Sequence, residues 1–152
     1  MLEFEHIVQV NDIGDASLPV LTRSQLWQGL VLRARSPDKF VQGLQCTSEQ
    51  ISGNEFMRTV QAGASSFREK VVLYPQEKIC TRTIADPNQI SAESTTRIEE
   101  PEVGSLFVHF SYRRDLDGHD QQVDVSEHLK AAYVQVDRDA ITMIRMLAES
   151  RQ

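Results

Sequence analysis

Apolar and polar positions alternate with period two over two parts of the chain, as in strands that bury one face. At the N-terminus Phe4, His6 and Val8 share one side of this alternation, which predicts a first strand that ends at Asn11-Asp12. The same pattern returns for about seventy residues. There it predicts six further strands, over roughly Leu44–Ile51, Glu55–Ala62, Ser65–Tyr74, Lys78–Ala85, Gln89–Glu99 and Ser105–Arg114.

Short segments rich in glycine and proline separate these six strands. They contain Gly53-Asn54, Gly63-Ala64, Pro75-Gln76, Pro87-Asn88 and Pro101 to Gly104. A parallel pair of strands needs a long crossover connection, whereas a short turn joins antiparallel neighbours. We therefore expect the six strands to form an antiparallel sheet.

Two helical segments are predicted directly after the first strand. Thr22-Arg-Ser-Gln25 has the spacing of a capping box, and apolar residues follow at helical intervals to about Arg35. Ser36-Pro37 then supplies an N-cap with proline in the first turn, so a second, very short helix is expected from Ser36 to Val41, before Gly43.

A long helix is predicted at the C-terminal end. It follows an acidic turn at Asp115 to Asp120, and Asp124-Val-Ser-Glu127 has the spacing of a second capping box. About 26 residues then continue without glycine or proline, a length of roughly 39 Å at 1.5 Å per residue. One side of this helix is apolar, with Leu129, Tyr133, Val136, Ala140, Ile144 and Leu147.

This order of elements defines an α+β fold over residues 1–152, which we expect to be a single domain. A seven-stranded antiparallel sheet must bury one face, and the long C-terminal helix is the element able to cover it. A sheet curved around one long helix, with two short helices after the first strand, tends to leave an internal cavity. Apolar cavities of this kind are the default sites for small-molecule ligands.

Composition and charge remove several other classes of function. Sixteen Lys and Arg against 22 Asp and Glu give a net charge of −6, so nucleic-acid binding is not expected. The longest apolar run has four residues, Val71 to Tyr74, too short for a membrane span or a secretory leader. We therefore expect a cytoplasmic protein in which Cys46 and Cys80 are reduced thiols.

Motifs for cofactors and metals are missing from the sequence. No two of the seven glycines are close enough for a phosphate-binding loop, and no histidine pair has the i, i+4 spacing of a zinc site. We therefore expect neither a metal nor a cofactor.

Charged residues at three positions of the predicted sheet are candidates for ligand binding. If the turns at Gly63-Ala64 and Pro75-Gln76 have two residues each, Arg58 lies opposite Glu69, and Glu69 lies opposite Arg82. On the cavity side, this row would orient a carboxylate, phenolate or enolate. On the outer side, it would be a salt ladder without function, and a slip of one residue exchanges the two faces.

Three aromatic residues are further candidates for the lining of the cavity. Tyr112 lies on a strand face with Leu106, Val108 and Phe110, and Tyr133 lies on the apolar side of the long helix. Each hydroxyl either points into the cavity or forms one ordinary hydrogen bond in the core. Trp27 on the first helix is either a core residue or a surface for the ligand. His6 shares the face of Phe4 and Val8, where it is either a cavity acid or base or a core histidine.

The element order resembles that of the START-like superfamily, which is also called the SRPBCC, Bet v 1-like or helix-grip fold. Phe4-Glu5-His6 and the stretch from Leu21 to Ala34, LTRSQLWQGLVLRA, resemble the AtaL-like branch of that superfamily. The resemblance implies a cavity for a hydrophobic ligand. The wider superfamily includes lipid and sterol carriers, hormone receptors and polyketide cyclases, and the branch offers no established catalytic motif to transfer.

Three functions are consistent with these observations. The first is binding of an apolar, lipid- or polyketide-like small molecule between the sheet and the C-terminal helix. The alternative is a cyclase or aromatase that acts on a polyketide-like substrate in the same cavity, with a Tyr, a His or Glu69 moving a proton. The third is an interaction module that pairs a sheet edge with another chain, and the sequence leaves a homodimer open.

Overall fold

The computed structural model describes residues 1–84, 89–116 and 123–150. Along the chain the elements are β1 (Leu2–Gln9), α1 (Arg23–Arg35), the 3-10 turn η1 (Pro37–Lys39), β2 (Leu44–Ser52), β3 (Glu55–Ala62), β4 (Ser65–Tyr74), β5 (Lys78–Thr83), β6 (Ala92–Glu102), β7 (Ser105–Arg114) and α2 (Val123–Ser150). The seven strands form one antiparallel sheet in the order β1-β7-β6-β5-β4-β3-β2. The predicted sheet and long C-terminal helix are confirmed.

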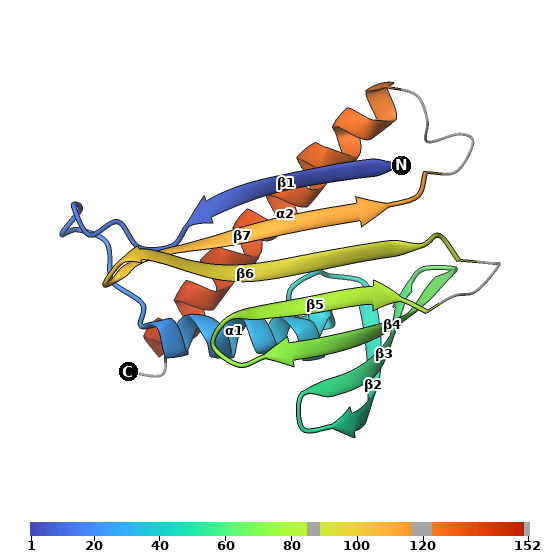
Figure 1. Ribbon diagram of the computed structural model, residues 1–152, viewed down its shortest axis with the longest axis horizontal. Helices are drawn as coiled ribbons and strands as arrows, with labels where there is room; N and C mark the ends of the chain where they lie inside the picture. The colour runs from blue at the N-terminus through green and yellow to red at the C-terminus, as the bar shows by residue number, and fades with distance from the viewer. Residues whose placement is uncertain (85–88, 117–122, 151–152) are drawn as a thin grey trace.

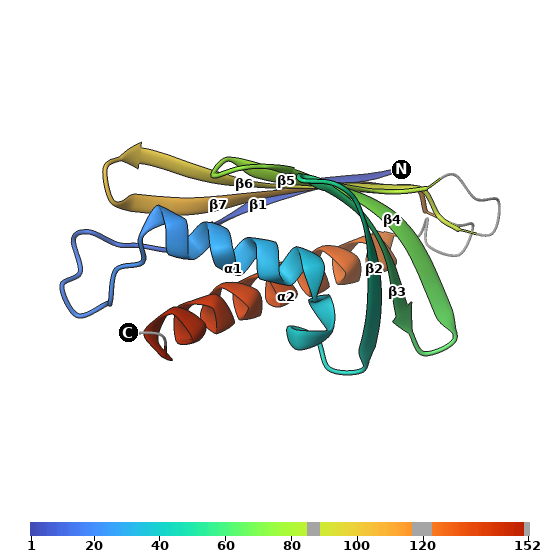
Figure 2. The ribbon, with the colours of Figure 1, turned by 90° about the horizontal axis from the view of Figure 1, so that it is seen from below.

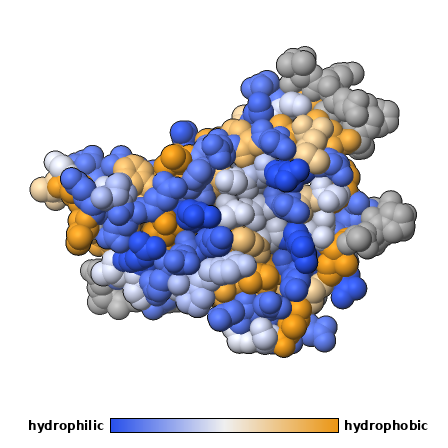
Figure 3. Space-filling model, viewed as in Figure 1, coloured by the Kyte–Doolittle hydropathy of each residue, from blue (hydrophilic) through white to orange (hydrophobic). Residues whose placement is uncertain are grey.

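Both long helices lie on the same side of the sheet (Figures 1 and 2). The part of the sheet that contains β2 and β3 bends toward this side, so the sheet wraps around the helices. The opposite face, toward the viewer in Figure 1, is largely hydrophilic (Figure 3). None of the described helices combines the length and the apolar character that crossing a bilayer requires.

The core lies between the sheet and the two helices. Phe56, Val108 and Phe110 from the strands are at most 1% exposed, and Leu26 from α1 and Ile144 from α2 pack in the same cluster. Gly29 allows α1 and α2 to approach closely, because a Cβ atom at this position would lie 2.7 Å from Ile144 Cγ1. The helix pair therefore depends on the missing side chain at residue 29.

The local signals around α1 act as predicted. Thr22 Oγ1 accepts a hydrogen bond from the Gln25 backbone N–H at 3.0 Å, and Gln25 Oε1 accepts one from the Thr22 N–H at 2.9 Å, which confirms the capping box. The predicted helix from Ser36 to Val41 is shorter than expected, a single 3-10 turn over Pro37–Lys39.

Some predicted features lie wholly or partly outside the described residues. The turn at Pro87-Asn88 and most of the acidic turn from Asp115 to Asp120 lie outside the described residues. The side chain of Asp124, the proposed cap of the long helix, also lies outside them. These features stay predictions.

The hairpin register is correct for one predicted turn and wrong for the next. Arg58 lies opposite Glu69, as a two-residue turn at Gly63-Ala64 requires. In the following hairpin Tyr74 pairs with Lys78, so the turn has three residues instead of two. The Glu77 N–H donates to the Tyr74 carbonyl at 2.9 Å and Gln76 has φ +65°, the features of a type II turn with proline at its second position.

Because of the extra turn residue, each side chain of β5 points to the face opposite to the predicted one. Thr81 points toward the helices, whereas Arg82 is exposed and pairs across the sheet with Lys70. Glu69 lies opposite Thr83, so the predicted Glu69–Arg82 pair is wrong.

The strands before and after residues 85–88 have bounds that differ from the predicted ones. β5 ends at Thr83, and β6 runs over Ala92–Glu102 instead of Gln89–Glu99. Gln89, which was predicted to begin this strand, contacts β4 through its side chain instead. Its amide nitrogen donates to the Arg68 carbonyl at 3.0 Å, and its oxygen accepts from the Arg68 N–H at 3.1 Å. Residue 89 therefore uses its side chain, and not its backbone, to bind the sheet.

Candidate functional site

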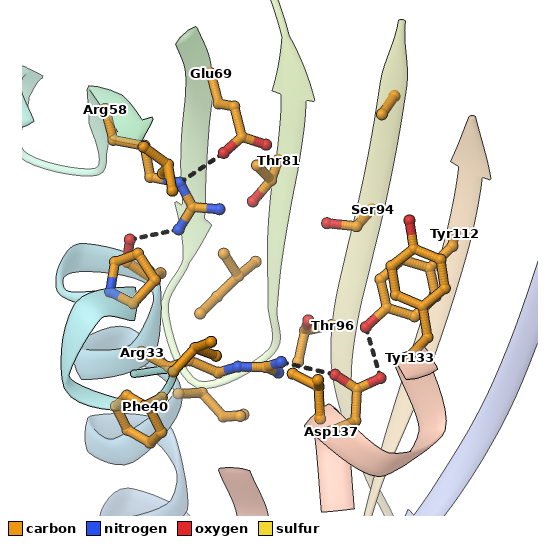
Figure 4. A pocket seen from close by; sticks show the side chains of 18 of the residues that line it. Arg33, Phe40, Arg58, Glu69, Thr81, Ser94, Thr96, Tyr112, Tyr133 and Asp137 are labelled. Carbon is orange, nitrogen blue, oxygen red and sulfur yellow. Dashed lines mark hydrogen bonds and ion pairs between the residues drawn. The ribbon is translucent and has the colours of Figure 1, made fainter. Parts of the chain in front are cut away.

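A cavity of about 310 Å³ lies between the bent sheet and the helices (Figure 4). Its apolar lining comes from α1, η1 and the segment after it, the strands β2, β3 and β5, and α2. It includes Leu30, Ala34, Pro37, Phe40, Val41, Leu44, Val60, Ile79 and Val136. Polar residues also line the cavity, and charged groups interact at two places among them. One is the Arg58–Glu69 pair, and the other surrounds Asp137.

The Arg58–Glu69 pair joins the strands to the C-terminal end of α1. Arg58 Nε donates to Glu69 Oε1 at 3.1 Å, and Nη1 donates to the Ala34 carbonyl at 2.7 Å. The two side chains are only 14% and 19% exposed. A guanidinium also complements the negative end of the α1 dipole. Two of the three residues in the predicted charged row therefore lie at the cavity.

The remaining predicted site residues divide between the cavity, the core and the surface. Tyr112 and Tyr133 line the cavity. Trp27 is 9% exposed within the hydrophobic core and is not part of the lining, because its position on α1 packs into the core cluster. Arg82 lies on the outer face of the sheet, for the reason of register given above.

Asp137 is the centre of the second polar cluster. This residue of α2 is fully buried, with 0% exposure. Its Oδ1 accepts a hydrogen bond from Arg33 Nη2 at 2.8 Å. Its Oδ2 accepts one from the Tyr112 hydroxyl at 2.5 Å and is 2.7 Å from His6 Nε2. Four separate elements, β1, α1, β7 and α2, supply the members of this cluster.

The Tyr112 phenol is strongly biased toward its neutral form. Burial is the largest cause that raises its pKa far above the ordinary value, and the negative charge of Asp137 raises it further. The ring stacks on Tyr133, with 4.1 Å between the ring centroids. Because Tyr112 donates its proton to Asp137, its oxygen lone pairs remain available to a ligand.

The other two members of the cluster, His6 and Arg33, pack against aromatic rings. The His6 ring stacks on Phe110, with centroids 5.1 Å apart, and also on Phe4 at 5.5 Å. The Arg33 guanidinium lies over the Phe110 ring at 5.8 Å from its centroid. His6 keeps 12% of its side chain exposed, so the cluster extends from the cavity lining to the surface.

Asp137 and Arg33 were missed at the level of sequence, although the sequence contains a signal for each. Asp137 is four residues after Tyr133 and three before Ala140, so an acidic residue lies on the apolar side of the long helix. Arg33 is three residues after Leu30, on the buried side of α1. A buried charge is rare without a partner, so each signal predicts that an opposite charge lies nearby.

The geometry permits two kinds of chemistry. The Arg58 guanidinium can bind an anionic oxygen on a ligand within apolar walls. The chain of contacts from Tyr112 through Asp137 to His6 can move a proton between the cavity and the surface.

Comparison with solved structures places the fold among Bet v 1-like proteins. The di-domain aromatase/cyclase StfQ from the steffimycin biosynthetic pathway matches with a TM-score of 0.74 and 13% identity, over 98% of this chain and 51% of that one. The Zhui aromatase/cyclase from Streptomyces sp. R1128 matches with a TM-score of 0.65 and 13% identity, over 99% and 94% of the two chains. The chain thus spans about half the length of the di-domain protein.

A plant enzyme has the same architecture. Norcoclaurine synthase from Thalictrum flavum, in complex with dopamine and hydroxybenzaldehyde, matches with a TM-score of 0.66 and 12% identity, over 99% of this chain and 88% of that one. At these identities the likeness shows the fold alone. No curated protein sequence matches the chain.

The chain thus has the Bet v 1-like, helix-grip fold. The family model described as acetylaranotin biosynthesis cluster protein L matches residues 6–151, so the chain belongs to the AtaL family.

Proposed function

We propose that this protein binds an apolar small molecule with one anionic group, a lipid- or polyketide-like ligand, in the cavity between the sheet and α2. The observation that carries the proposal is Arg58, a guanidinium that lines the cavity beside apolar side chains. Glu69 and the Ala34 carbonyl hold two of its nitrogen atoms. Figure 4 draws no hydrogen bond from the third nitrogen, Nη2, to the residues shown, which supports its assignment to an anionic ligand.

A titration calorimetry experiment with a defined probe tests this proposal. 2-Naphthoate carries one anionic group on an apolar ring system, and 2-acetylnaphthalene is its neutral counterpart. A hydrogen bond to a charged group contributes about 1.5–3 kcal/mol, so we expect Arg58→Leu to weaken 2-naphthoate binding about tenfold or more. The loss for 2-acetylnaphthalene is expected to be smaller.

Arg82→Leu is the matched control, because Arg82 lies on the outer face of a strand whose inner face lines the cavity. We expect this variant to bind both probes like the unmodified protein. Since Arg58→Leu leaves the Glu69 carboxylate unpaired, the double variant Arg58→Leu/Glu69→Leu is measured beside it. Equal binding of 2-naphthoate to all these variants, or none to the unmodified protein, would refute the proposal.

Cyclase or aromatase activity is the second candidate function, and the Asp137 cluster is the observation that favours it. In such a reaction the Tyr112 oxygen takes a proton from a carbon next to a ligand carbonyl while the Tyr112 proton passes to Asp137 Oδ2. The ligand becomes an enolate, and His6 exchanges the proton with solvent. Two of the solved structures with this fold are described as aromatase/cyclases.

Deuterium exchange at the methyl group of 2-acetylnaphthalene, followed by NMR in D₂O, tests this second candidate. We expect the unmodified protein to accelerate the exchange and Tyr112→Phe to lose most of the acceleration while it still binds the probe. An exchange rate that does not change when protein is added would exclude proton transfer to this class of carbonyl compound.

A further inference from the structure

Four hydroxyl groups that line the cavity form no hydrogen bond with any residue that the structure describes. They belong to Thr81, Ser94, Thr96 and Tyr133 (Figure 4). Neither a side chain nor a backbone group of the described residues forms a hydrogen bond with any of these hydroxyls. Every fully buried side-chain oxygen or nitrogen of the described residues has a hydrogen-bond partner. Since the four hydroxyls have none, they are not fully buried, and they are accessible from the cavity.

The strand register arranges three of these hydroxyls along one wall. Thr81 on β5 lies directly opposite Ser94 on β6, and Ser94 lies opposite Tyr112 on β7. Thr96 follows Ser94 by two residues, so both side chains point to the same face of β6. Tyr133 reaches the same region from α2, where its ring stacks on Tyr112. Figure 4 shows that this polar wall runs between Arg58 and Asp137.

A hydrocarbon ligand does not fit the chemistry of this wall. It would cover the hydroxyls and remove their access to water without replacing the lost hydrogen bonds. The penalty for a buried polar group without a partner corresponds to about a tenfold loss of affinity for each hydroxyl. A ligand with oxygen atoms along the same edge would instead gain those hydrogen bonds.

We propose that the ligand is an oxygenated molecule, with an anionic group at Arg58 and hydroxyl or carbonyl oxygens along the edge that faces Thr81, Ser94 and Tyr133. A plain fatty-acid chain is therefore not the ligand. This inference rests on the proposed binding function and chooses between the lipid-like and the oxygenated ligand classes.

Calorimetric comparison of matched probes tests the inference. The matched set consists of three probes, 2-naphthoate and its dihydroxylated forms 3,5- and 3,7-dihydroxy-2-naphthoate. Decanoate represents a plain anionic chain. We expect at least one dihydroxylated probe to bind about tenfold more tightly than 2-naphthoate, and decanoate to bind more weakly than either. Ser94→Ala and Thr81→Val are each expected to remove about two- to tenfold of the gain from hydroxylation.

Ser111→Ala is the matched control, because Ser111 lies on the neighbouring strand β7 and lines a groove on the outer face of the sheet. It is expected to leave all affinities unchanged. If 2-naphthoate does not bind, the binding function itself fails. If 2-naphthoate binds through Arg58 but hydroxylation gives no gain, or if decanoate binds most tightly, the binding function stands and the oxygenated ligand is refuted.

Discussion

Replacement of Asp137 by alanine is expected to destabilise the protein strongly. The carboxylate is fully buried and receives hydrogen bonds from Arg33 and Tyr112, with His6 Nε2 at 2.7 Å. Loss of one partner of a buried ion pair costs about 3–5 kcal/mol, because the other charge stays buried without compensation. For a chain of this size each kcal/mol lowers the melting temperature by about 2–4 °C, so Asp137→Ala should melt about 6–20 °C lower.

Circular dichroism measures both quantities, the melting temperature in a thermal scan and the free energy of unfolding in a urea titration. Asp139→Ala is the control on the same helix, because Asp139 is exposed and bonds only to Gln135 within the described residues. Its unfolding midpoint should stay close to that of the unmodified protein. Asp137→Asn should lie between the two, since the amide oxygen can still accept from Arg33 while its N–H groups face Tyr112 and His6. If Asp137→Ala were as stable as Asp139→Ala, the cluster would contribute nothing to folding and the reasoning would be wrong.

Three further predictions concern the pH dependence and the packing of the fold. Since the pKa of Tyr112 is raised on folding, the unfolded chain loses this proton first as the pH rises above about 10. From pH 10 to pH 11 the free energy of unfolding of the unmodified protein should therefore fall by up to about 1.4 kcal/mol more than that of Tyr112→Phe. An equal fall in urea titrations of the two proteins would contradict this. Gly29→Ala should cost about 1–3 kcal/mol by overlap with the γ carbons of Ile144, and it should cost less in an Ile144→Ala background, which lacks those carbons, if that overlap is the cause. Gln76→Gly should raise the melting temperature, because glycine adopts φ +65° without strain, and a lower melting temperature would show that the Gln76 side chain stabilises the turn.

The elements of the fold follow from local patterns that act over a few residues. The capping box at Thr22 needs only four residues, and the strands β3, β4 and β7 have the bounds that alternation predicts. The pairing of Arg58 with Glu69 also follows from the sequence, because Gly63-Ala64 forms the two-residue turn that fixes the register of β3 and β4. These features are decided by neighbours in the chain, so one sequence suffices to predict them.

The site depends on contacts that no local pattern contains. A single additional turn residue, Glu77, placed Arg82 outside and Thr81 inside, because every side chain of a strand changes face when the register moves by one. The Asp137 cluster joins residues that are more than a hundred positions apart, such as His6 and Asp137. The sequence by itself determined the sheet and the helices, whereas its signal for a buried acid on α2, Asp137, was missed. Only the tertiary structure decided which donors meet that acid and which hydroxyls face the cavity, since both depend on how the sheet bends around the helices.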